Sequence, residues 1–212
     1  YGRRYRNDLF AEWEAHWQPA WTSVIGVRGT RVTTDAAAVQ GYDNGLAGSW
    51  GNDASAFNAR DHKRVDNNWD FTALMRFTAD STARYEGGYA RKSRAPSLYQ
   101  RYPWSTNPMA ALMNNFVGDG NGYIGNPDLR PEVAHTASIT GDWKDAEKAR
   151  WNLKATAYYT YVENYIDARR CDFGQCSAEN LTKTSGFVHL QYVNQQARIY
   201  GVDLSGGVLL GR

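Results

Sequence analysis

Apolar and polar residues alternate with a period of two along several long stretches of the chain. Between residues 8 and 18 the odd positions carry apolar side chains and the even positions carry mostly charged or polar ones, and the same alternation recurs at 68–78 and 151–161. Shorter versions of the alternation occur elsewhere, at 23–32, 83–92, 136–143 and 198–209. Because successive side chains of a β-strand point to opposite faces, this period predicts strands with one apolar and one polar face.

The length of these strands favours a membrane barrel over a soluble sheet. Each runs for about ten residues or more, which is what a strand tilted by about 45° needs to cross a bilayer. Strands of soluble proteins are usually about five to six residues long. Several aromatic residues also lie toward the strand ends, namely Trp69, Trp143, Trp151, Tyr159 and Tyr161. This placement is typical of the aromatic girdles at the two interfaces of a membrane.

The connections between the predicted strands alternate in length. Short turns are expected at Pro19–Ala20, Asp80–Thr82 and Lys144–Arg150. Long polar loops are expected on the other side, at about 34–67, 93–133 and 168–186. Bacterial outer-membrane barrels have short periplasmic turns and long extracellular loops, whereas unstructured loops of this length are uncommon in compact soluble domains.

The sequence therefore predicts an all-β fold, part of a large antiparallel transmembrane β-barrel with short periplasmic turns and long extracellular loops. Roughly seven or eight strands of this kind fit in the chain. No apolar strand with an aromatic end finishes it, so we expect a portion of a larger barrel. Strand parity assigns a lipid-facing set, Trp13, Phe71, Ala73, Met75, Leu153 and Ala155. It assigns Arg76, Lys154 and Asp203 to the lumen.

The composition agrees with such a barrel without requiring it. The chain has 212 residues, 14% of them aromatic, and a mean hydropathy of −0.65. Barrel strands average out as hydrophilic, and no apolar run reaches the ~18 residues of a transmembrane helix. A formal net charge of +2 gives no strong attraction to nucleic acid, so no nucleic-acid partner is expected. A soluble β-sandwich with an aromatic core has the same composition.

The two cysteines, Cys171 and Cys176, lie close together in a polar stretch that contains a glycine. In an oxidising compartment such a pair suits a small disulfide-closed loop. The alternative is a pair of thiolate ligands for a soft metal, although the second Cys/His pair of a typical site is missing. We expect the disulfide, in an extracellular loop.

Three segments, in order along the chain, resemble the TonB-dependent receptors. Residues Tyr89–Tyr99 (YARKSRAPSLY) are similar to that family's strand-to-loop signature, and Gly125–Glu132 (GNPDLRPE) to its Gly-Asn-Pro-x-Leu-x-Pro-Glu element. The stretch Tyr192–Leu204 is similar to a third element that ends in Gly-Val-Glu, with Asp203 standing where the family more often has Glu. Pro96 is expected to end a strand, and Pro127 and Pro131 to stiffen the loop that returns to the next one. Gly201 is expected to mark a β-bulge.

The resemblance implies that residues 1–212 are part of a receptor barrel of about 22 strands with a plugged lumen, and that the plug domain and the terminal strands lie outside this chain. It implies active uptake of a scarce nutrient across the bacterial outer membrane. The implied partners are outer-membrane lipid, the TonB complex (through the plug region) and a small nutrient or metal ligand. A receptor of this kind is not an enzyme, and the sequence contains no recognisable order of nucleophile, base and orienting residue.

Two further segments resemble the copper-receptor branch of the family. They are Arg101–Thr106, continuing into 109–127, and Tyr165–Cys171. The resemblance implies copper or a metal complex as the transported ligand, with no bound cofactor. A siderophore or cobalamin receptor is the nearest alternative. A passive porin, an outer-membrane esterase and a soluble sugar-binding sandwich are more distant ones.

Met109 and Met113 are the candidate metal ligands. Their i, i+4 spacing puts both thioethers on one face if the segment is helical, and soft sulfur ligands favour Cu(I). The alternative is a short amphipathic helix whose methionines, with Leu112 and Phe116, cap the barrel mouth by packing. No His or Cys lies nearby in the sequence to complete a metal site.

Overall fold

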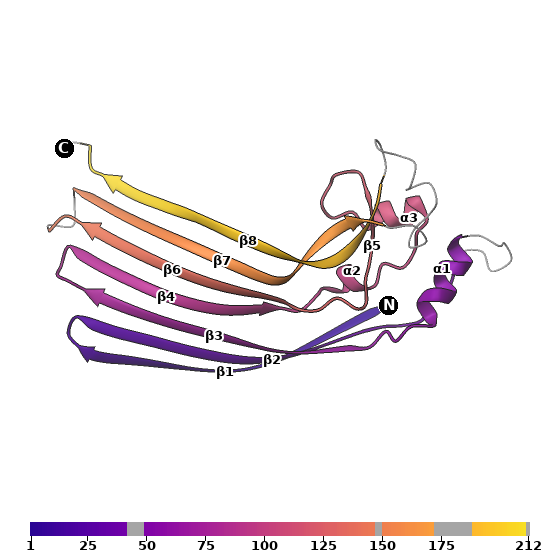
Figure 1. Cartoon of the computed structure of the whole chain (residues 1–212), viewed down its shortest axis with the longest axis horizontal. Helices are drawn as coiled ribbons and strands as arrows, with labels where there is room; N and C mark the ends of the chain where they lie inside the picture. The colour runs from indigo at the N-terminus through magenta and orange to yellow at the C-terminus, as the bar shows by residue number, and fades with distance from the viewer. Residues whose placement is uncertain (42–48, 147–149, 172–187, 211–212) are drawn as a thin grey trace.

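The chain forms one curved, mainly antiparallel sheet in the computed structural model (Figure 1). The structure describes residues 1–41, 49–146, 150–171 and 188–210. Its strands are β1 (Gly2–Gln18), β2 (Trp21–Ala36), β3 (Arg64–Thr78), β4 (Ala83–Arg94), β5 (Gly122–Ile124), β6 (Glu132–Lys144), β7 (Trp151–Arg170) and β8 (His189–Val208). The all-β prediction is confirmed. Strands β1, β7 and β8 extend well beyond the predicted stretches, into flanking residues without regular alternation.

The strand order follows the sequence, as expected for a meander. It runs β1-β2-β3-β4-β6-β7-β8, with each of these strands antiparallel to the next. The short strand β5 pairs in parallel with the start of β8, where Gly122 lies opposite His189. Antiparallel neighbours need only short turns, and three such turns join the strands at one end of the sheet (Figure 1).

Helices occupy part of the long connections at the other end. They are α1 (Ser49–Asn58), α2 (Leu98–Arg101) and α3 (Pro108–Met113). Ser97 caps α2 through a capping box with Gln100, and Asn107 caps α3, which has a proline at its first turn. The sequence interpretation of these connections as polar loops was therefore incomplete. Among the described residues, no helix has the length and apolarity to cross a membrane.

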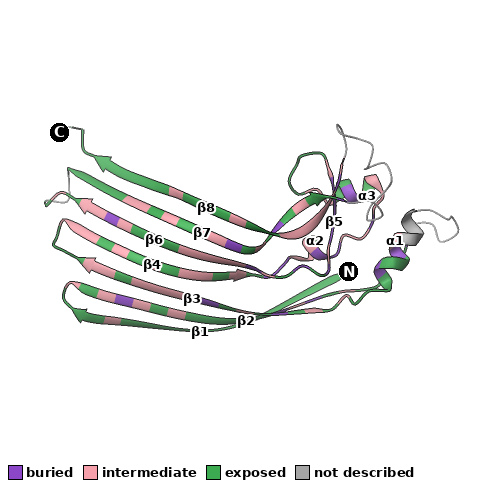
Figure 2. Ribbon diagram, in the orientation of Figure 1, coloured by how far each residue is buried: buried purple, intermediate pink, exposed green. Residues whose placement is uncertain are grey.

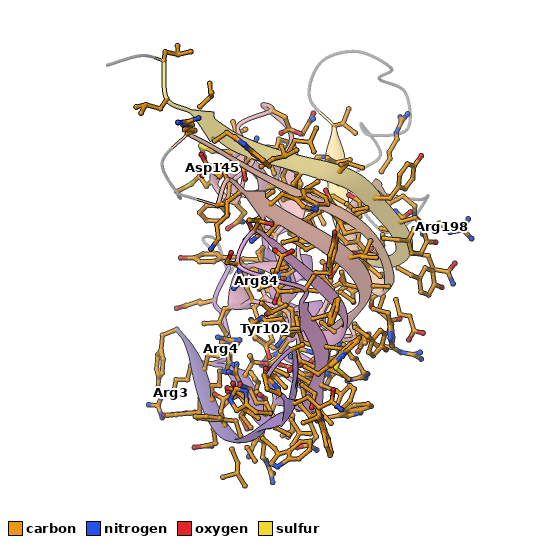
Figure 3. The ribbon with its side chains drawn as sticks, turned by 90° about the vertical axis from the view of Figure 1, so that its left-hand side faces the viewer. Arg3, Arg4, Arg84, Tyr102, Asp145 and Arg198 are labelled. Carbon is orange, nitrogen blue, oxygen red and sulfur yellow. The ribbon has the colours of Figure 1, made fainter. Side chains whose placement is uncertain are left out.

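The sheet has two chemically distinct faces, and the register shows which residues share each face. One row across the sheet consists of His16, Thr22, Arg76, Glu86, Thr140, Thr156 and Asp203. A row on the opposite face consists of Trp13, Ile25, Ala73, Tyr89, Ala137, Tyr159 and Tyr200. In Figure 3 the sheet curves between Arg84, on the concave side, and Arg198, on the convex side. Arg84 lies opposite Thr78 and shares the polar face, so the polar face is concave.

The convex face is apolar and exposed over most of its length. Large side chains there remain uncovered, with Leu9 81%, Ile139 65% and Leu204 70% exposed. Figure 2 shows exposed and intermediate residues alternating along the long strands, with buried residues concentrated toward the end that carries the long connections. A soluble monomer rarely exposes a continuous apolar surface of this extent. This exposed apolar surface therefore argues against the soluble sandwich.

The expected bulge at Gly201 is wrong. Gly201 pairs regularly with Tyr158, and the register shift between β7 and β8 falls instead between Val162 and Tyr165. A Cβ atom at Gly201 would lie 2.8 Å from the Tyr158 hydroxyl oxygen. The glycine therefore makes room for a tyrosine on the polar face and does not bend the strand.

Candidate functional site at the loop end of the sheet

The connection between β4 and β6 folds over the concave face and is held there by a buried arginine. The Arg101 guanidinium donates to both carboxylate oxygens of Asp66 on β3, at 2.8 and 2.9 Å. It also donates to the Thr34 hydroxyl on β2 at 2.9 Å and to the Leu129 carbonyl at 2.8 Å. Arg101 is 1% exposed. Such a charge is stable when buried only because it is paired and hydrogen-bonded.

The neighbouring Tyr102 extends this anchor to a second connection. Its hydroxyl donates to the backbone carbonyl of His62 at 2.7 Å, and its oxygen lies 3.0 Å from the Thr34 hydroxyl oxygen. Burial raises the pKa of Tyr102, so the phenol keeps the proton that it donates to the His62 carbonyl. The His62 ring stacks on Phe57 of α1 with 4.1 Å between ring centroids. The α1 connection is thereby fixed to the same cluster.

The three family-like segments meet at this rim. Glu132 accepts from the Arg94 guanidinium and, at 2.7 Å, from the Ile166 backbone N–H on β7. The Asn194 side chain bonds the backbone N–H and carbonyl of Arg130, at 2.8 and 3.0 Å. Glycine is required at position 125, where a Cβ atom would lie 2.6 Å from the Arg101 carbonyl oxygen. The motif residues thus build the rim, in agreement with their interpretation as structural.

An apolar groove lies between α2, α3, the start of β1 and the end of β2. Its volume is about 530 Å³. Aromatic and sulfur-containing side chains contribute much of its lining, among them Tyr1, Phe57, Tyr99, Tyr102, Trp104 and Met113. A groove of this size and lining is typical of sites for small molecules.

The two candidate methionines lie on α3, so the helical spacing is present. Met109 is 66% and Met113 79% exposed, and only Met113 lines the groove. The alternative, in which these residues pack over the barrel mouth, also has support, because the Phe116 ring contacts the Tyr99 ring with 4.5 Å between centroids. Among the described residues, no three His, Cys, Asp or Glu side chains gather in a way that could hold a metal ion. Metal binding by Met109 and Met113 stays a prediction.

The cysteines are only partly placed. Cys171 is 4% exposed at the end of β7, and its backbone N–H donates to the His189 carbonyl at 3.2 Å. Cys176 lies outside the described residues. The disulfide therefore stays a prediction.

The residues assigned to the lumen share the concave face. Arg76 pairs with Glu86 across β3 and β4 at 2.9 Å, and Asp203 lies in the same row. Lys154 lies opposite Asp142, which is paired with Arg84 at 3.2 Å. Charged and hydroxyl side chains thus pair across the concave face. That this face lines a closed lumen stays a prediction, and so does contact of the convex residues with lipid.

Asp119 organises a tight turn before β5. Its carboxylate accepts from the Asn121 side chain and backbone at 3.0 Å each, from the Tyr123 hydroxyl at 2.8 Å and from the Asn115 amide at 2.9 Å. These bonds, those from Asn121 first, lower the pKa of Asp119 to about 2. Burial, with the bond to Asp119, raises the pKa of Tyr123 to about 12.

Sequence reasoning did not identify the Arg101, Asp66 and Tyr102 cluster. In the sequence, Arg101 and Tyr102 belong to a segment that resembles the copper-receptor branch, and with Trp104 they are the residues that would suit a siderophore. Neither pattern predicts their contact with Asp66. A weak signal existed, because a charged Asp at position 66 continues the polar set of its strand toward the loop end. Nothing local identifies its partner, which is 35 residues away.

A single curved sheet of long strands, with an apolar convex face and elaborate connections at one end, defines a segment of a β-barrel domain. A family model described as "TonB dependent receptor-like, beta-barrel" matches residues 1–211. The chain belongs to this family.

The individual relatives are much longer than this chain. The chain is 29% identical over 133 residues to the "Heme/hemopexin utilization protein C" of Haemophilus influenzae (strain 86-028NP), a match that covers 59% of this chain and 17% of that protein. The solved structure of the copper transporter OprC matches with a TM-score of 0.66 and 14% identity, covering 100% of this chain and 26% of OprC. The hemophore receptor HasR of Serratia marcescens, solved with its hemophore HasA and heme, has the same TM-score of 0.66 and 17% identity, covering 97% and 32%. At these identities the two structures establish the fold alone.

Proposed function

We propose that this chain is a barrel segment of an outer-membrane receptor that imports copper, as the ion or as a complex, with energy supplied through TonB. The chain spans 17% to 32% of the relatives named above, so the plug region that would contact TonB belongs to the remainder of such a protein. Family membership supports active uptake of a nutrient. The residues at the loop end support the choice of substrate.

The orientation in the membrane rests on the two faces of the sheet. Aromatic pairs occur near the short turns, where Trp21 contacts Phe77 and Tyr85 contacts Trp143. Another pair, Phe71 and Tyr89, lies farther along the same face toward the long connections. Two aromatic levels separated by an apolar band are typical of transmembrane barrels. Because outer-membrane barrels have short periplasmic turns and longer external loops, we assign the short turns to the periplasm and the groove and α3 to the exterior.

The observation that carries the copper proposal is the exposure of two thioethers on α3, one of them at the groove. A receptor meets its ligand from outside, and α3 belongs to an external connection in this orientation. Thioether sulfur is a soft ligand that favours Cu(I) over Zn²⁺. Two thioethers do not complete a copper site, so the remaining ligands would come from the plug or from other loops.

The test uses the full-length receptor in detergent and measures Cu(I) affinity and metal content. Replacing both residues, Met109→Leu with Met113→Leu, keeps side-chain volume and removes sulfur. We expect Cu(I) binding to weaken by at least about tenfold, because even loss of a group that only orients a metal ligand typically costs about 10–100-fold in affinity. Met75→Leu is the matched control, because Met75 is the third methionine of the chain and lies on the convex face. Wild-type affinity in the double variant would assign the methionines to packing, and a receptor that binds no copper would refute the substrate.

A second candidate ligand is an iron porphyrin. The relative named for heme and hemopexin utilisation favours it, and the aromatic lining of the groove suits a planar apolar molecule. Titration of the same receptor with hemin, followed by its absorption spectrum, separates the candidates. Saturable hemin binding that Trp104→Ala weakens, together with no copper binding, would replace copper by heme.

A further inference from the structure

A second, polar pocket opens on the outer side of the rim, away from the groove. Its volume is about 460 Å³, and its lining includes Arg130, Tyr161, Glu163, Asn164, Gln195 and Gln196. It lies at the register shift between Val162 and Tyr165, where Asn164 adopts a left-handed φ of 54°. At this shift Asn164 and Gln196 lie between the paired positions of β7 and β8, and both residues line the pocket. Their side-chain amides can therefore face a ligand there.

One arginine lines the pocket, and a second lies beside one of its lining residues. Arg130 lines it, and Arg198 lies directly opposite Tyr161 on the convex face, where Figure 3 shows it extending away from the sheet. Within the described part of the chain, neither guanidinium forms an ion pair. The one carboxylate of the pocket, Glu163, lies 4.0 Å from the His135 Nε2 atom. The arginines thus outnumber the carboxylate.

The position of the pocket along the convex face indicates which part of the membrane it contacts. Tyr161 and Arg198 lie in the row next to Tyr159 and Tyr200, which belong to the apolar face. In the proposed orientation this row is the outer boundary of the hydrocarbon layer. Aromatic residues at that boundary lie among lipid headgroups. A ligand here would be outside the barrel wall and could not be cargo in the lumen.

We propose that this pocket binds the phosphorylated sugar headgroup of an outer-leaflet glycolipid. Arginine forms charge-assisted, bidentate bonds with phosphate oxygens. The amides of Asn164, Gln195 and Gln196 can both donate to and accept from sugar hydroxyls, and the Tyr161 ring offers a flat surface for a sugar. Phosphate binding and hydroxyl binding at the headgroup level together select this ligand. The inference rests on the proposed membrane orientation.

The experiment compares full-length receptor variants in detergent for binding of a fluorescent phosphorylated bacterial glycolipid. Arg130→Ala with Arg198→Ala should weaken binding by at least about tenfold, the order expected for loss of charge-assisted bonds. The control is Arg31→Ala, because Arg31 is an exposed arginine on the same convex face, opposite Asn7 and Asn67 and distant from the pocket. It should change binding by less than about twofold. Heat-modified gel mobility verifies that each barrel is folded.

Two further arms separate the source of the phosphate from the failure of the orientation. Inorganic phosphate and the dephosphorylated glycolipid should each bind more weakly than the intact glycolipid. Equal binding by inorganic phosphate would reduce the site to a phosphate site and overturn the headgroup assignment. Wild-type glycolipid binding by the double variant would overturn the pocket itself. Copper uptake is measured separately, so failure of the transport proposal is distinguishable from failure of this one.

Discussion

Arg101 and Asp66 form a bidentate ion pair that fixes the connection between β4 and β6 to the concave wall of the sheet. Their side chains are 1% and 8% exposed. The pair lies between two connections, since Arg101 also contacts Thr34 while the adjacent Tyr102 reaches the His62 carbonyl. This buried charge pair therefore contributes to the position of α3 and of the groove.

Removing one partner of this pair should loosen the whole β4–β6 connection. Asp66→Ala leaves an unpaired buried guanidinium, which typically costs about 3–5 kcal/mol. We expect faster hydrogen exchange and proteolysis within residues 95–131 of the full-length receptor, including β5, with the long strands unaffected. Asp128→Ala serves as control, because it removes an exposed carboxylate that pairs with Arg60 and Arg64. Unchanged exchange in the Asp66 variant would show that the connection is held by other contacts.

Gly125→Ala should disturb the same region from the backbone side. The added Cβ would lie 2.6 Å from the Arg101 carbonyl carbon and oxygen and 2.7 Å from the Pro103 ring. Because these atoms cannot rotate away, we expect a local loss of about 1–3 kcal/mol, as for overpacking in a core. Gly29→Ala is the matched control, since nothing lies within 4 Å of its Cβ position. Chemical denaturation and loop proteolysis of both variants measure the difference.

The orientation of the sheet predicts an asymmetry between adjacent positions. Ala73→Arg places a charge on the convex face near mid-membrane and should cost about 2–4 kcal/mol. Thr72→Arg places the same side chain on the concave face and should be tolerated much better. Folding of the two variants into lipid vesicles, followed by gel mobility, gives the comparison. Equal tolerance would refute the assignment of the convex face to lipid.

The strands and their faces were predictable because period-two alternation is local information. Trp13 and Arg76 could be assigned to faces without knowing any partner. The loop end was not predictable in the same way, because its contacts join distant residues. Gly122 pairs in parallel with His189, and Arg101 pairs with a carboxylate on another strand. The prediction of a bulge at Gly201 was wrong because the glycine makes room for the Tyr158 side chain on the neighbouring strand, which the local sequence does not reveal.

The turn around Asp119 should respond to acid. Its pKa of about 2 lies below the ordinary 3.8, so its stabilisation is complete above pH ~4 and is lost as the pH falls through about 2. We expect the backbone amides of Val117–Tyr123 to lose exchange protection in that range while the barrel persists. The Asp119→Asn variant should show weaker protection at neutral pH and no such transition. A transition that is the same in both proteins would belong to another group.

Cys171 and Cys176 are predicted to form a disulfide in an external connection. Thiol reactivity and mass spectrometry test this prediction. Cys171 is buried, so a lone thiol there would react slowly with alkylating reagents, whereas the polar residues around Cys176 predict an accessible one. Mass spectrometry of the non-reduced receptor should find both residues in one linked peptide, two hydrogens lighter than the reduced form. Closing a short loop stabilises it by about 2–3 kcal/mol in the chain-entropy model, so reduction should increase proteolysis between β7 and β8. Two free thiols in freshly prepared receptor would refute the disulfide and restore the soft-metal alternative, which copper titration of Cys176→Ser would then examine.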